Sequence, residues 1–446
     1  MSFKINTITL ILGFFAFNSV LAAENKLENL SQIYQQALAN SPQYQAYFYT
    51  MESEKTKQNI ALSPLFPNLT LSANIQQNYA QKANLSGTYR NYQTGIAISQ
   101  VLFNYTTYQT YQASKQSALQ AEETYALQKQ KFIVNVAIAY FNVLKAKEQL
   151  AFSQANLEAV TSTLKESKLK LKVGMSTDVD VKAAEANYYD ALAQVKIKEN
   201  EVSTAYFALY QYTGVENHNL ANLKTNLDFA NPKPNNIAVW ISTAEQHNAE
   251  LNAQIYAENA AHINLSGSYG SFLPTVSLQA EYGVNNAKGN SQGFALGDVT
   301  AGNAKSGAIT LQFQWNILNG GTDYASIKKA AFEYQKEQFN TLEQQRSIKQ
   351  KIETDFYNVI STIKRIQSLK QSVVAADSAY QQYQVRFKVG NATITDVLDQ
   401  LKTLYQSESQ LAEAKYAYIT NMLNLKLDAG ILSPEDIDDF NRWLDA

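Results

Sequence analysis

The chain has 446 residues, enough for two or three ordinary globular domains. Its formal net charge of −2 gives no electrostatic footprint for nucleic acid, so no nucleic-acid partner is expected. Cysteine is absent, which excludes disulfides, zinc thiolates and cysteine nucleophiles. The 7 prolines suit long uninterrupted helices, and the 28 tyrosines suit a belt at a membrane interface.

The N-terminus has the pattern of an export signal. Lys4 precedes an apolar run at residues 10–17, and small residues suited to cleavage follow at positions 20–23. We therefore assign residues 1–23 to a signal peptide. A retained membrane anchor is the alternative, but the run is shorter than the ~20 residues that a spanning helix needs.

Residues 24–214 form the first of two predicted repeats: a helix, a β-hairpin, a long helix, a turn and a returning helix. The hairpin is expected at about 66–103, after Pro67, where apolar and polar residues alternate with the period of a strand. On the first strand the apolar positions are Leu69, Leu71, Ala73 and Ile75. Residues 81–91 are predicted to be an exposed loop.

The second predicted repeat, residues 215–430, has the same order of elements. Gly174 and Gly390 lie 216 positions apart, as do Gly214 and Gly430, so the chain is an internal duplication. An apolar stripe of period seven precedes each turn. Its members are Val136, Val143, Leu150, Leu157, Leu164 and Leu171 in one half, and Ile352, Val359, Ile366, Val373, Tyr380 and Phe387 in the other. The second hairpin is expected at about 273–318, with an exposed loop at 285–306.

The period of seven specifies long helices that coil around partners. They are expected from roughly Tyr105 to Lys172 and from Asp323 to Lys388, each on the order of 100 Å long at ~1.5 Å per residue. The molecule must then be a rod or tube. A solvated two-helix coiled coil without a lumen is the alternative.

Each predicted strand run of about 9–11 residues has the length of a tilted membrane strand. Four strands cannot close a barrel, and the edges of an open sheet are costly in hydrocarbon. Several copies must therefore associate, although this argument does not fix their number. A soluble sandwich would show the same alternation. The predicted class is an α+β membrane protein with a helical tunnel and four transmembrane strands per subunit.

No enzyme, cofactor or metal site is predicted. His218, His247 and His262 are scattered, and none has a metal-ligand partner one helical turn away. The remaining segment, residues 431–446, is expected to be a short capping helix, with Ser433 as N-cap and Pro434 at the first helical position.

The sequence resembles the TolC family of outer-membrane channel proteins over nearly the whole mature chain. The stretches that carry the resemblance are "LSQIYQQALANSPQYQA", "SPLFPNLTL", "AYFNVLKAKEQL", both "KVG" turns, "TDVLDQLKTLYQSESQLAEAKYAYI" and "LNLKLDAG". The resemblance implies a homotrimer with one twelve-stranded β-barrel in the outer membrane of a Gram-negative bacterium and a helical tunnel in the periplasm. It also implies a periplasmic adaptor, an inner-membrane pump of the RND or ABC type, and export of drugs or secreted proteins.

The resemblance further implies a periplasmic gate at the turns. Asp396 and Asp399, at i and i+3, would form two stacked rings of carboxylates, which suit a cation-preferring entrance. Asp180 is a weaker candidate, because Ala183 stands where the first half would need the second acid. The expected adaptor-docking tips are Val173, Gly174, Met175, Val389, Gly390 and Asn391.

Three positions depart from the family's pattern for a latch between neighbouring coils. Phe387, Ala392 and Val179 stand where a tyrosine, an arginine and a hydroxyl residue would make hydrogen bonds or ion pairs. Closure is therefore expected to depend on the packing of Phe387 and on the aspartate rings, giving a gate that opens more easily. The alternative function is an outer-membrane coiled-coil scaffold or adhesin, which would pass no ion current.

Overall fold

The computed structural model describes residues 27–82, 85–217, 219–224, 227–289 and 302–445. The proposed signal peptide, His218 and most of the predicted loop at 285–306 lie outside these ranges. The elements in chain order are α1 (Leu30–Asn40), α2 (Pro42–Leu62), η1 (Ser63–Leu65), β1 (Asn68–Lys82), β2 (Leu85–Phe103), α3 (Tyr105–Lys172), α4 (Asp178–Thr213), α5 (Ile237–His247), α6 (Ala249–Ser268), η2 (Tyr269–Phe272), β3 (Thr275–Gly289), β4 (Gly302–Gln314), α7 (Thr322–Lys388), α8 (Ile394–Asp428) and α9 (Pro434–Asn441).

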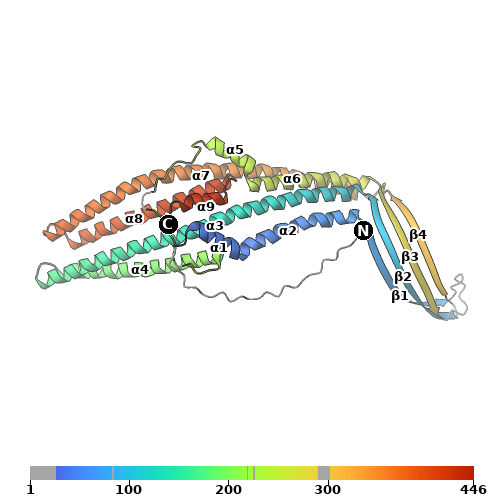
Figure 1. Ribbon diagram of the computed structural model, residues 1–446, viewed down its shortest axis with the longest axis horizontal. Helices are drawn as coiled ribbons and strands as arrows, with labels where there is room; N and C mark the ends of the chain where they lie inside the picture. The colour runs from blue at the N-terminus through green and yellow to red at the C-terminus, as the bar shows by residue number, and fades with distance from the viewer. Residues whose placement is uncertain (1–26, 83–84, 218, 225–226, 290–301, 446) are drawn as a thin grey trace.

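The molecule is a long rod (Figure 1). The four strands form one end, the α3–α4 and α7–α8 hairpins form the other, and α1, α5 and α9 lie around the middle. The two long helices contain 68 and 67 residues, close to the predicted bounds. Among the described helices, none combines the length and the apolar character needed to cross a membrane.

The sheet is antiparallel throughout, in the order β1-β2-β3-β4. Its register places the alternating apolar residues of all four strands on one face, because Leu69 pairs with Ile98, Ile98 with Ala280, and Ala280 with Ile309. The next row carries Thr70, Ala97, Glu281 and Ala308, and faces the opposite side. The predicted alternation with one apolar and one polar face is confirmed.

The strands are longer than predicted, with 15, 19, 15 and 13 residues. The predicted loops at 81–91 and 285–306 are partly wrong, because the backbone ladder continues to Lys82 and Leu85 and to Gly289 and Gly302. Backbone pairing does not depend on side-chain polarity, so the strands continue past the point where the alternation fades. At the other end, β4 stops at Gln314, four residues before the predicted end of the hairpin at about 318.

Each half begins with two helices where one was predicted. Ser41 ends α1 and caps α2, and Asn248 ends α5 and caps α6, at equivalent positions. Both residues have extended backbone angles, which interrupt the helix, and a side-chain oxygen of each accepts a backbone N–H of the next helix. Pro42, the first residue of α2, stabilises the start of that helix.

The main core lies in the middle of the rod, where the short helices pack on the long ones. The apolar stripes are buried there, at Val136 and Val143 on α3 and at Ile352, Val359 and Ile366 on α7. Towards the turns the stripe positions are half-buried. Packing is therefore densest at mid-shaft and looser near the hairpin ends.

The C-terminal helix closes this core. Ser433 and Asp436 form a capping box, and Ile437 and Phe440 are buried, as a capping helix requires. Gly430 lies just after α8, next to the C-cap residue Ala429, and its φ of 74° is left-handed. The turn at Gly430 presses against the backbone of His247, so a Cβ there would overlap the His247 carbonyl.

This contact gives a prediction with a matched control. Gly430→Ala should lower the free energy of unfolding by about 2–5 kcal/mol, from left-handed strain plus overlap with His247. Gly390→Ala has the same left-handed strain, with φ 82°, but nothing lies within 4 Å of its added Cβ, so about 1–2 kcal/mol is expected. Thermal unfolding of both variants measures the difference, and equal losses would contradict the packing assignment.

Candidate functional site

The two hairpin turns lie at the end of the rod opposite the sheet (Figure 1). Each follows a long helix that ends in a lysine, Lys172 or Lys388, and each leads into a shorter returning helix. The structure thus places Asp180 and Asp396 in the first turns of the two returning helices, and Asp399 one turn further along α8, all at one end of the molecule.

Both turns close with the same backbone motif. Gly174 and Gly390 have φ of 75° and 82°. The N–H of the following residue reaches back to the long helix, from Met175 to the Lys170 carbonyl and from Asn391 to the Arg386 carbonyl, each at 2.8 Å. This is the Schellman arrangement, which needs a residue that tolerates left-handed angles and satisfies the last carbonyls of the helix.

Each returning helix then starts with a capping box. Thr393 N–H and Oγ1 donate to Asp396 Oδ2 at 2.8 and 2.7 Å, and Asp396 N–H donates to Thr393 Oγ1 at 3.2 Å. Thr177 and Asp180 repeat the arrangement in the first half, with N–H and Oγ1 distances of 3.0 and 2.7 Å. Asp396 thus caps the start of α8, and Asp180 has the same role at the start of α4.

These hydrogen bonds keep both carboxyl groups ionised. The Thr393 hydroxyl, followed by its backbone N–H, holds the pKa of Asp396 below the ordinary value. For Asp180 the backbone N–H of Thr177 is the larger cause of a lowered pKa, and its hydroxyl adds to the effect. Asp399 is exposed one turn further along α8, and the buried residues Val397 and Leu398 lie between the two acids in sequence. The i and i+3 spacing places Asp396 and Asp399 close together on the helix surface.

Phe387 lies in the last turn of α7 and packs against a small second core of Val160, Ile394, Leu398 and Leu401. The Nζ of Lys170, from the other hairpin, lies 3.5 Å from the centroid of the Phe387 ring and 3.4 Å from its carbonyl oxygen, to which it donates. This cation–π contact joins α3 to α7 beside the turns. Sequence reasoning missed Lys170, because its partner is 217 positions away and no local pattern marks the pair.

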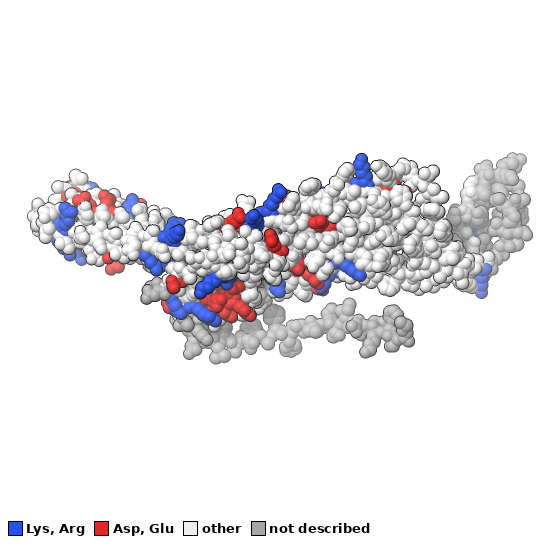
Figure 2. Space-filling model, turned by 90° about the horizontal axis from the view of Figure 1, so that it is seen from above, with Lys and Arg blue, Asp and Glu red and all other residues white. Residues whose placement is uncertain are grey.

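The outermost turn residues are apolar and exposed. Val173, Met175 and Val389 are 68%, 75% and 66% exposed, and Val179 beside them is 76% exposed. Charged side chains are sparse and mixed in sign over the visible face of the rod (Figure 2). Over the residues that the structure describes, no group of three or more metal-binding side chains is placed to hold an ion.

The chain was compared with known proteins. The family model described as "Outer membrane efflux protein" matches residues 33–215 and 240–430. The chain is 30% identical to outer membrane protein TolC of Vibrio cholerae over 94% of each chain, and 22% identical to alkaline protease secretion protein AprF of Pseudomonas aeruginosa over 91% of this chain and 85% of AprF. The crystal structure of the Campylobacter jejuni CmeC outer membrane channel superposes with a TM-score of 0.77 at 18% identity, covering 94% of this chain and 90% of CmeC.

The capping boxes give a pH-dependent prediction. A lowered pKa means that the Thr393–Asp396 contact stabilises the turn above the ordinary carboxyl pKa of 3.8, and that this stabilisation is lost as the pH falls through the lowered value. Thr393→Val should therefore speed amide hydrogen exchange in residues 393–398 severalfold at pH 7. The difference from wild type should shrink in acid, once exchange is corrected for its intrinsic pH dependence. Thr393→Ser, which keeps the hydroxyl, should exchange like wild type; a T393V turn that is equally protected at pH 7 would refute the role of the cap.

Proposed function

The chain belongs to the outer membrane efflux protein family, and from this premise we propose that three copies form one channel leading from the periplasm to the cell exterior. The protein is an outer-membrane export channel. The family description refers to efflux, and the name of the relative AprF refers to secretion of an alkaline protease; these words support drugs or secreted proteins as the cargo of this channel.

The main support for the proposed three-copy assembly is that the strands and the helices follow the same neighbour order. β1 and β4 are the two edges of the sheet, and within the chain neither edge strand pairs with the other. Below the sheet the helices follow the same order: α2 contacts α3, α3 contacts α6, and α6 contacts α7. One rotation that brings β4 beside β1 of the next copy therefore also brings α7 beside α2.

The outer helices carry exposed apolar side chains that suit this contact. Tyr49 and Ile60 on α2 are 67% and 65% exposed, and Phe332 and Phe339 on α7 are 58% and 71% exposed. In three copies the four strands of each would complete a twelve-stranded barrel. Its apolar face would meet outer-membrane lipid, and its polar face would line a wet interior.

At the other end, six turns would surround the opening of the tunnel. Asp396 and Asp399 would form the gate and the cation-preferring rings, with Asp180 contributing from the first half and Phe387 packing behind the turns. Like charges in a ring attract cations and raise one another's pKa, so the hydrogen bonds from Thr393 help to keep Asp396 charged.

The channel is tested by ion current in planar bilayers. Wild type should conduct with a reversal potential that favours cations, and Asp396→Asn with Asp399→Asn should remove the preference without lowering conductance. Asp439→Asn on α9, an exposed acid far from the turns, should change neither. A wild-type protein that passes no current would support the scaffold or adhesin alternative instead.

The exposed apolar tips are proposed to bind a periplasmic adaptor, which would join the channel to an inner-membrane pump of the RND or ABC type. The docking residues would be Val173, Gly174, Met175, Val389, Gly390 and Asn391. Because the chain has no cysteine, Met175→Cys and Asn391→Cys give unique crosslinking sites. They should capture one adaptor species in cells, whereas Asp439→Cys at mid-shaft should not. Equal capture at all three sites would contradict docking at the tips.

A further inference from the structure

Gln149 on α3 lies where the continuous core of the rod ends. Buried side chains are dense on α3 from Phe132 to Ala146, and Gln149 is the last of this series. Between Gln149 and the end of the helix, only Val160 and Ser167 are buried. Gln149 is therefore the boundary between the tightly packed middle and the looser hairpins that carry the turns.

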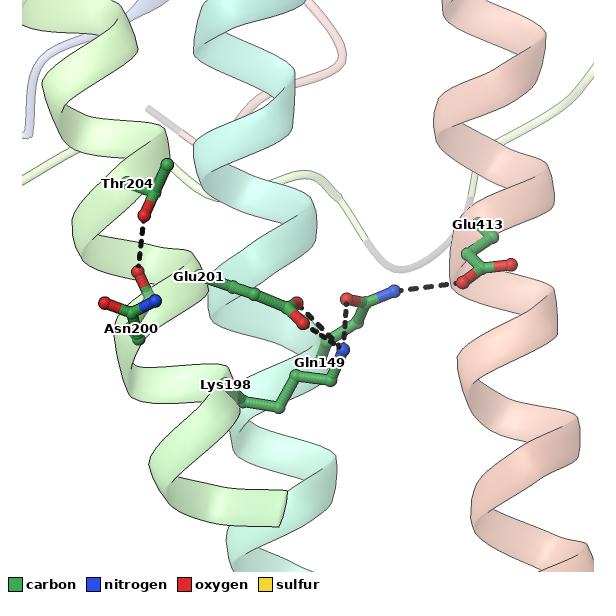
Figure 3. Close-up of polar contacts among 6 residues, drawn as sticks. All are labelled: Gln149, Lys198, Asn200, Glu201, Thr204 and Glu413. Carbon is green, nitrogen blue, oxygen red and sulfur yellow. Dashed lines mark hydrogen bonds and ion pairs between the residues drawn. The ribbon is translucent and has the colours of Figure 1, made fainter. Parts of the chain in front are cut away.

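The amide of Gln149 joins three helices (Figure 3). Its side chain is 8% exposed, yet both ends of the amide have partners on other helices. Lys198 Nζ on α4 donates to Gln149 Oε1 at 3.4 Å, and Gln149 Nε2 donates to Glu413 Oε1 on α8 at 3.2 Å. Glu201 fixes the lysine with contacts of 2.9 and 2.8 Å.

We call the chain Glu201–Lys198–Gln149–Glu413 the Gln149 relay. It crosses from one hairpin to the other through a single buried amide. A buried amide that loses a partner pays a desolvation penalty, so the relay favours one relative position of α3 and α8. By contrast, the Asn200–Thr204 contact in the same view stays within α4 and joins nothing across helices.

Between the relay and the turns, the two hairpins are separated by a cleft of about 390 Å³. Gln149 and Lys198 line the end of the cleft nearer the middle of the rod. Val160 and Leu398, from the small second core, line the end nearer the turns. The hairpins thus touch at the level of the relay, where Lys415 on α8 also lies 4.0 Å from Glu148 on α3, and again beside Phe387, with the cleft between these two regions. Such an interface resists rotation mainly at its two contact points.

We propose that the Gln149 relay is the pivot that sets the angle between the α3–α4 and α7–α8 hairpins and so holds the gate closed. The proposal rests on the proposed channel function, and Gln149 acts in it as a positioning residue. The end of α3 lies 23 residues beyond Gln149, about 35 Å along a helix. A rotation of about 10° at the relay would displace the turns by about 6 Å over that length, enough to change the opening between them.

The decisive test exchanges the amide of Gln149 and the carboxylate of Glu413. Gln149→Glu places a carboxylate against Glu413, which should separate the hairpins and raise the open fraction of the purified channel about tenfold in planar bilayers, the shift expected from losing one charge-assisted hydrogen bond. Adding Glu413→Gln restores a donor opposite an acceptor, while the new carboxylate still accepts from Lys198. The double variant should therefore return to the wild-type open fraction.

A matched control comes from the neighbouring ion pair on the same helix. Lys196 pairs with Glu199 at 2.8 Å with the spacing of Lys198 and Glu201, but its side chain is 68% exposed against 25% for Lys198. Lys196→Met should leave the open fraction unchanged, whereas Lys198→Met should raise it. Gln149→Met, similar in length but without an amide, should also raise it and replaces Q149E if that variant does not assemble.

The outcomes separate the two proposals. A wild-type protein without current contradicts the channel function. A conducting wild type contradicts the relay alone if the Gln149 variants match it, if the double variant stays as open as Q149E, or if K196M and K198M behave alike.

Discussion

The open edges of the four-stranded sheet are the constraint on which the rest of the structure depends. Each unpaired N–H or C=O group costs several kcal/mol in hydrocarbon, so a sheet in a membrane must have no free edge. The chain provides β1 and β4 as edges and repeats the same neighbour order in its helices. In the proposed assembly, closing the sheet therefore also closes the helical shaft beneath it.

The duplication gives both halves the same backbone solutions but different side chains at the turns. Glycine, capping threonine and first aspartate are shared, as Gly174, Thr177 and Asp180 match Gly390, Thr393 and Asp396. The contacts that join the halves use residues without an equivalent partner. Lys170 lies on the Phe387 ring, and Gln149 binds Glu413. The two turns therefore have the same backbone structure, whereas the contacts between the two hairpins are asymmetric. Those contacts can change in sequence without changing the turns.

Packing along the rod is graded in a way that suits a stationary middle and movable ends. At mid-shaft, α1, α5 and α9 surround the long helices, and Tyr140 is fully buried with its hydroxyl bound to the Ala221 carbonyl at 2.9 Å. Near the turns the core shrinks to a few residues beside a polar cleft. Regions with few buried contacts open at lower free energy than the core. The exposed apolar tips lie in this looser part, where binding of a partner would have the greatest effect on the opening.

The sequence alone determined the features that arise from local chemistry and regular period. The turn glycines, the Thr393–Asp396 cap and the two-faced strands follow from residues close together in the chain, whose conformational preferences are strong. The 216-residue repeat follows from comparing the two halves of the sequence position by position. Tertiary structure decided how far the strands extend, because backbone pairing continues without a side-chain pattern. It also decided the Lys170–Phe387 and Gln149–Glu413 contacts, whose partners are 217 and 264 positions apart. Those contacts depend on where rigid helices about 100 Å long cross, and no local sequence pattern specifies that position.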